Sequence, residues 1–321
     1  MNEREIERVA AAVMYEGYLL YPYRLSVKNV RRWTFGTVPP GGAEIRSEVL
    51  VEGSAPGAVT ARIRFLQVQQ RTVRRAEGET FSPVESLEVS GVLHVPWQEG
   101  IEREVVLGAA PLHGLSVIRS FRFDSEQRRE FLREAGGKIA GVVDRDTGDL
   151  AGRVELRAEP VRPGLFRLAV ALLNESAIDD PTDGERRSFM AVHAILHVDS
   201  GRFLSLTDPP AADVDPARSC RNVGLWPVLI GDPASVLCSP IILPDYPRLA
   251  EESPGDLFDG TEIDEILSLR IRTLTESEKR EMASIDPRAR AILQRTEALA
   301  RRELASLHGA WRSAGEARHA T

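Results

Sequence analysis

Apolar and polar residues alternate along most of the chain between Glu44 and Val198. A period of two is typical of β-strands with one buried face, because successive side chains point to opposite sides of a sheet. The runs with this pattern are VTARIRFLQVQ, LEVSGVLHV, REVVLG, LSVIRSFRFD, KIAGVVDRD, GRVELRAEP, LFRLAVALLNES and SFMAVHAILHVD. Many short strands with little helix between them predict an α+β protein that is mostly β, with antiparallel β-sandwich or open barrel modules.

Helical spacing replaces this alternation near the beginning of the chain. Ile6, Val9, Ala10 and Val13 recur at intervals of three and four residues, which places them on one face of a helix. The pattern predicts a short N-terminal helix with one apolar face.

Three helix starts are marked in the last quarter of the chain. Thr261 with Asp264, and Thr275 with Glu278, have the form of capping boxes, in which a hydroxyl and an acid satisfy the free amides of a helix start. A proline directly after Asp286 marks a third start, because proline is favoured at the first helical position. These signals predict a C-terminal helical segment.

One further helix is expected inside the β-rich region, where Ser125 caps the run SEQRREFLREAGG and Gly136 ends it. Such a helix would separate two β modules, which places a boundary near residue 130. We therefore expect three parts: an N-terminal β-rich module with the opening helix and an aromatic segment (1–130), a second β-rich module that ends in an acidic loop (131–260), and C-terminal helices (261–321).

The charge of the chain is concentrated in one place. Between Asp245 and Glu265 there are eight acidic residues and one basic residue, Arg248, which accounts for the whole net charge of −7. A basic face is absent, so we expect no nucleic-acid partner. The acids fit a docking loop for a protein, with Asp245, Asp256, Asp259 and Asp264 as candidate contacts. Two alternatives remain open. The acids could cap a helix start, where the helix dipole favours negative charge, or they could bind a hard cation.

A second candidate surface combines aromatic and basic residues near the start of the chain. Such a combination could stack on a ligand or bind an anion, and the alternative is that the rings are core wedges with hydroxyls at the rim. Its candidate contacts are Tyr15, Tyr18, Tyr21, Tyr23, Arg24, Lys28, Arg32 and Trp33.

Metal-binding and nucleophilic motifs are weak. His193 and His197 lie on a predicted strand, where positions four apart are roughly 13 Å from one another, too far to share one ion. Cys220 and Cys238 lack the CxxC spacing of a zinc or iron–sulfur site, and we expect Cys238 to be buried among apolar neighbours. No GxSxG motif or P-loop occurs, so we expect no cofactor and a protein that is not an enzyme.

The compartment follows from the cysteines and from the start of the sequence. Two cysteines make no disulfide framework, which fits a reducing compartment. MNEREIERVAAAVMYEGYLL has neither the charge order of a signal peptide nor the length of a membrane span. We expect a cytoplasmic protein without membrane contact.

The runs MYEGYLLYPYR, SFMAVHAILHVDSGRFLSL, SPIILPDYPRLAEESPGDLFDGTEIDEILSLRI and DPRARAIL resemble an uncharacterised bacterial family associated with NiFe hydrogenase gene clusters. The resemblance implies an accessory role in assembling, stabilising or delivering a metalloenzyme. It implies a protein partner, either a NiFe hydrogenase subunit or a maturation factor. It assigns no site residues.

The leading hypothesis is therefore a non-catalytic accessory protein that uses the acidic loop and the aromatic-basic segment as contact surfaces. A second hypothesis is an enzyme or metal-binding module with a site between them, for which Tyr21, Arg24, Asp256 and Asp259 would be tested first. A third is a structural subunit that associates with copies of itself as a homo-oligomer.

Overall fold

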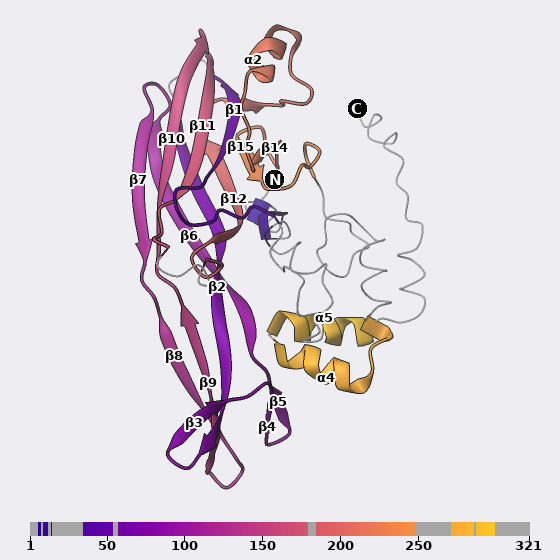
Figure 1. Ribbon diagram of the computed structural model, residues 1–321. Coiled ribbons are helices and arrows are strands. Elements are labelled where there is room, and N and C mark those ends of the chain that lie inside the picture. The colour runs from indigo at the N-terminus through magenta and orange to yellow at the C-terminus, as the bar shows by residue number, and fades with distance from the viewer. Residues whose placement is uncertain are drawn as a thin grey trace. The chain divides into compact units, whose positions relative to one another are not determined.

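The computed structural model describes residues 6–7, 9–11, 14, 35–53, 57–178, 184–247, 271–285 and 287–298. These residues belong to two compact units. The first contains the described residues up to Pro247, and the second contains those from Ile271 onward. Figure 1 shows the elements of both.

The first unit contains two large antiparallel sheets. The smaller one has the strand order β13-β1-β11-β10-β7, with the bounds β13 (Arg202–Leu204), β1 (Glu44–Glu52), β11 (Leu165–Asn174), β10 (Leu150–Arg162) and β7 (Ser116–Phe123). The larger one has the order β14-β15-β12-β2-β9-β8, with the bounds β14 (Trp226–Leu229), β15 (Ser235–Ser239), β12 (Phe189–Val198), β2 (Ala58–Glu77), β9 (Ile139–Thr147) and β8 (Gln127–Arg133). Four further strands are β3 (Thr80–Pro83) and β6 (Trp97–Pro111), which both pair with β2, and the hairpin of β4 (Leu87–Val89) and β5 (Val92–His94).

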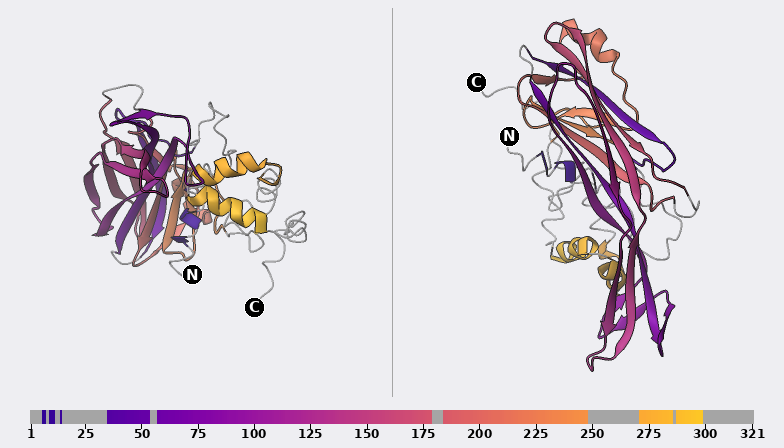
Figure 2. Two further views of the ribbon diagram at one scale, coloured as in Figure 1. Left: turned by 90° about the horizontal axis from the view of Figure 1, so that it is seen from below. Right: turned by 90° about the vertical axis from the view of Figure 1, so that its left-hand side faces the viewer.

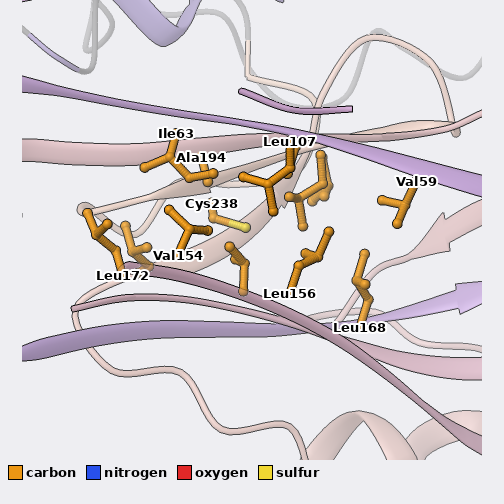
Figure 3. Close-up of a cluster of buried hydrophobic side chains, with 14 of the residues drawn as sticks. Val59, Ile63, Leu107, Val154, Leu156, Leu168, Leu172, Ala194 and Cys238 are labelled. Carbon is orange, nitrogen blue, oxygen red and sulfur yellow. The ribbon is translucent and has the colours of Figure 1, made fainter. Parts of the chain in front are cut away.

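The two sheets pack face to face as a β-sandwich, as two directions of view show (Figure 2). Alternate residues of the facing strands form one continuous apolar core. Figure 3 shows part of it, with Val154, Leu156, Leu168 and Leu172 from the smaller sheet and Ile63 among those from the larger one. The predicted fold class is confirmed: the protein is mostly β, its sheets are antiparallel, and they do not close into a barrel.

Strand β2 is 20 residues long and extends beyond the sandwich. Its first part pairs with β12 on one side and β6 on the other, and its last part pairs with β9 and β3. A second, smaller core covers this extension, where Leu87 and Val89 of the β4-β5 hairpin pack on Val73, Val143 and Leu132. One strand therefore connects two separate hydrophobic cores.

A band of buried polar groups lies between these two cores. Gln67 is fully buried, donates to the carbonyl oxygen of Gly148 at 2.6 Å and accepts from Nε of Arg103 at 2.8 Å. Arg71 donates to Glu99 at 3.1 Å, and burial lowers the pKa of its guanidinium. The groups are paired with one another, as buried charges must be if they are not to destabilise the fold.

An opening helix is confirmed within the described residues 6–7, 9–11 and 14. Ile6, Val9 and Ala10 of the predicted apolar face are buried. Glu7 forms ion pairs with Arg62 and Arg64 on β2, and the distance to Arg64 is 2.9 Å. The ion pairs attach this helix to the outer face of the larger sheet.

The helix expected between Ser125 and Gly136 is wrong, because residues 127–133 form strand β8. Its charges are satisfied across the sheet instead of along a helix: Arg129 binds Asp144 of β9 at 2.6 Å and Glu130 binds Arg145 at 2.9 Å. Leu132 is buried while its neighbour Phe131 is exposed, which is the alternation of a strand. Cross-strand pairing with β9 overrides the local helical spacing.

The structure does not divide at residue 130. This residue lies within β8, and both sheets combine strands from before and after it. For example, β7 pairs with β10 and β2 pairs with β9. Both β-rich parts belong to one compact unit.

The second unit contains helices α4 (Glu276–Ile285) and α5 (Pro287–Ala298), so the C-terminal helical segment is confirmed. The capping box at the start of α4 is present: the amide of Thr275 donates to Glu278 at 2.8 Å, and the amide of Glu278 donates back to the Thr275 hydroxyl at 3.3 Å. The capping box expected at Thr261 lies outside the described residues. In the part of the chain that the structure describes, no helix is long and apolar enough to cross a membrane.

Candidate functional site

Most of the candidate contacts expected from the sequence lie outside the described residues. This holds for the whole aromatic-basic set and for three of the acids, which are Tyr15, Tyr18, Tyr21, Tyr23, Arg24, Lys28, Arg32, Trp33, Asp256, Asp259 and Asp264. Their roles stay predictions.

Asp245 is the candidate acid that the structure describes, and its carboxylate is bound within its own fold. One oxygen accepts the backbone amide of Leu229 at 2.9 Å. The other accepts the hydroxyls of Ser205 at 2.5 Å and Thr207 at 3.2 Å. Asp245 therefore ties three segments of the first unit together, and its acceptor positions are occupied by neighbours in the chain.

The histidines lie on strand β12, as expected. His193 is fully buried and His197 is exposed, and they pair with Arg64 and Thr60 of β2 at separate places along the sheet. Within the described residues there is no group of three or more histidine, cysteine, aspartate or glutamate side chains that could hold a metal ion.

Both cysteines have free thiols. Cys238 is buried in the sandwich core, as predicted, and Figure 3 shows its sulfur between the two sheets. Burial raises the pKa of its thiol to about 12, so the group is protonated at neutral pH. Cys220 is partly buried, and burial raises the pKa of its thiol as well. Neither thiol has the lowered pKa of a nucleophile.

One lateral side of the sandwich is closed by the chain itself. The segment before β14 crosses to β1, where Arg46 and Val223 exchange two backbone hydrogen bonds of 2.8 Å. The side chain of Asn222 accepts the amide of Glu48 at 2.8 Å and the hydroxyl of Ser47 at 3.0 Å. The two sheets are therefore joined along this side.

The opposite side of the sandwich is open. It lies between β6 of the larger sheet and β7 of the smaller sheet, which are not paired with each other. A cavity of about 200 Å³ lies between these strands. Its apolar wall is made by Leu107, Ala110, Val117 and Leu156, and Arg119 also lines it. We call this cavity the edge slot.

Arg119 occupies an inward-facing position of β7. It pairs in register with Val154 of β10, which is fully buried in the core, and its neighbours on the same face are Val117 and Phe121. Arg119 itself is exposed. Among the residues that the structure describes, no carboxylate lies within ion-pair distance of its guanidinium. One unpaired positive charge thus borders an apolar slot.

The slot has room for an incoming group. Gly108 of β6 lines it, and a Cβ atom added there would meet nothing within 4 Å. Toward the other end of the strands the space between the sheets is filled, because Phe65, Phe121 and Phe189 pack with ring centroids 4.6 to 6.0 Å apart. The opening is therefore confined to the part of β6 and β7 that flanks Arg119.

A second hollow, of about 140 Å³, lies on the outer face of the smaller sheet. It is a trough over Ala169 and Ala171 between charged residues of β1 and β10. Its arginines are paired with its glutamates, for example Arg157 with Glu155 at 2.9 Å.

The sequence carries a signal for the edge slot that is not a sequence motif. In LSVIRSFRFD the apolar positions are Val117, Phe121 and Phe123, and Arg119 interrupts this inward-facing set. A charge in an apolar register marks a place where the sheet face is not fully covered. No protein-family model matches the chain, and no curated protein matches it significantly.

Proposed function

We propose that this protein is a non-catalytic accessory protein that binds another protein, and that the edge slot is part of its contact surface. The observation that carries the proposal is the open side of the sandwich, where two strand edges flank an apolar cavity with one unpaired guanidinium. Strand edges with unpaired amides and carbonyls are templates for the pairing of another chain.

The charged groups elsewhere on the first unit support binding over catalysis. Their ion pairs run mainly across neighbouring strands, as in Arg74 with Asp144 at 3.1 Å and Arg145 with Glu130 at 2.9 Å. Such pairs hold strands in register. A catalytic acid or base needs a perturbed pKa and a cleft, and the buried His193 lines neither of the two hollows described above.

The partner class comes from the resemblance noted above, which points to a NiFe hydrogenase subunit or a maturation factor. In addition to the edge slot, two proposed contact surfaces remain: the acidic stretch between Asp245 and Glu265, and the aromatic-basic segment. Asp245 is the exception, because its carboxylate is engaged within the fold.

Co-purification with the partner tests the proposal. Gly108→Leu adds a side chain to the lining of the edge slot at a place where a Cβ atom meets nothing within 4 Å, so the fold should be retained while the recovered partner falls. Gly136→Leu is the matched control, because Gly136 also has open space around its Cβ position and lies at the distant β8-β9 turn. Equal recovery of the hydrogenase subunit or maturation factor with both variants would refute the use of this surface.

A further inference from the structure

We propose that the occupant of the edge slot is an extended acidic segment of the partner, which adds to the smaller sheet as a strand beside β7. This inference rests on the proposed function and specifies the chemistry of its partner. The segment would place one apolar side chain in the slot and, two positions away, a carboxylate against Arg119.

Strand β7 is the better of the two edges for such pairing. It pairs with β10 in unbroken register over all eight of its residues, from Ser116 to Phe123. Its far edge has no strand partner in the described part of the chain. Strand β6 has a register shift opposite Val59 and Ala61, close to Gly108, which interrupts its regular spacing of donors and acceptors.

The spacing of the two side chains follows from strand geometry. Residues directly opposite in paired strands point to the same face, and positions two apart share that face. A residue opposite Val117 would therefore enter the slot beside Leu107 and Leu156. The residue two positions along would lie opposite Arg119. This gives the pattern apolar-x-acid or acid-x-apolar, according to the direction of the added strand.

Charge selects the occupant. Strand β7 contains two arginines and no acid. Arg122 already binds Asp124 at 2.9 Å and Asp149 at 3.1 Å, whereas Arg119 has no carboxylate within ion-pair distance among the described residues. A second copy of β7 would bring further arginines and no acid, so pairing of two β7 edges is disfavoured. An acidic strand satisfies Arg119 and replaces the missing wall of the slot.

The same arginine could instead serve only to prevent strand pairing at this edge, since an inward-facing charge on an edge strand discourages pairing with other chains. The two roles differ in one respect. A charge that only prevents pairing weakens the binding of every added strand. A charge that serves recognition makes the affinity depend on the charge of the added strand.

The experiment uses the full chain and three fluorescein-labelled synthetic peptides with strand-forming sequences. They share one leucine and differ two positions from it, where they carry glutamate, glutamine or lysine. Fluorescence anisotropy should give the tightest binding for the glutamate peptide, with the lysine peptide about tenfold weaker, and the difference should shrink at high salt. Arg119→Glu should reverse this order. Arg75→Glu, an exposed arginine near the far end of β2, should leave it unchanged.

Equal binding of the three peptides, or an order that survives Arg119→Glu, would overturn the inference. A second result would also overturn it: the wild type binds the three peptides equally, and Arg119→Val makes the chain self-associate in sedimentation. Arg119 would then only prevent unwanted pairing at the edge. Gly108→Leu separates this outcome from the proposed function. If it abolishes partner recovery while peptide charge has no effect, the slot binds a partner of different chemistry. If recovery is unaffected, the proposed function itself is wrong.

Discussion

The buried imidazole of His193 should make the first unit sensitive to mild acid. The ring is fully buried, and its Nδ1 lies 3.2 Å from the carbonyl oxygen of Ala191. A carbonyl only accepts hydrogen bonds, so Nδ1 carries the proton in the neutral ring. Among the residues that the structure describes, Nε2 has no hydrogen-bond partner. Protonation would place a positive charge there without a partner.

The pKa of His193 is lowered to about 4, chiefly by burial and in part by Arg64 and Arg62. The Ala191 carbonyl and Glu102 oppose this shift without cancelling it. In the unfolded chain the pKa is near its ordinary value of about 6.5. Between these two values the unfolded chain binds a proton that the folded chain does not.

The sign and size of the effect follow from this difference. A histidine whose pKa is lowered by folding contributes no penalty above pH about 6.5, and stability is then lost as the pH falls toward about 4. One pH unit corresponds to about 1.4 kcal/mol, so the free energy of unfolding should fall by about 3 kcal/mol over this window from His193 alone.

Urea denaturation at a series of pH values measures this loss. Carboxylates contribute to acid destabilisation in every variant. The informative quantity is therefore the difference in the free energy of unfolding between the wild type and His193→Gln at each pH. That difference should change by about 3 kcal/mol between about pH 7 and about pH 4, in favour of the variant at low pH. His197→Gln, at an exposed position of the same strand, is the control. Parallel pH profiles for the wild type and His193→Gln would refute the reasoning.

Two further predictions concern the sandwich core. Leu168→Ala removes a fully buried side chain and should lower the free energy of unfolding by about 3 kcal/mol, whereas Ile118→Ala, at a position that is 55% exposed, should change it by less than about 0.5 kcal/mol. Similar losses for the two variants in chemical denaturation would contradict the assigned core. In the folded protein iodoacetamide should modify Cys220 before Cys238, because Cys238 is fully buried and its thiol has a raised pKa. Peptide mass spectrometry after labelling should show both cysteines modified only in denaturant. Early labelling of Cys238 would place its thiol at the surface.

The strands were predictable because alternation is a local property of the sequence. Every alternating run expected between Glu44 and Val198 overlaps a strand of the structure. The capping box at Thr275 was equally local, since the residues that form it are three positions apart. Residues 127–133 were predicted wrongly because their local spacing fits a helix, and the deciding contacts come from β9.

The sequence marks Arg119 as an unusual residue on its strand, but it could not locate the candidate site, for a related reason. An arginine at position 119 is informative only once β7 is known to be the last strand of its sheet and β6 to belong to the other sheet. Both facts depend on pairings between distant parts of the chain. Charge counting emphasised the acids between Asp245 and Glu265 instead, and the first of them proved to be a structural acceptor.

The length of β2 has a consequence for biosynthesis. This strand leaves the ribosome early, while β9 and β12, which must flank it, are made much later in the chain. Until they arrive, its long edge has few native partners, and contacts of such wide sequence separation form slowly. We therefore expect the nascent chain to depend on chaperones that shield β2. Yield in a recombinant host should fall when translation is slowed after β6 has been made, because β2 then waits longer for β9 and β12.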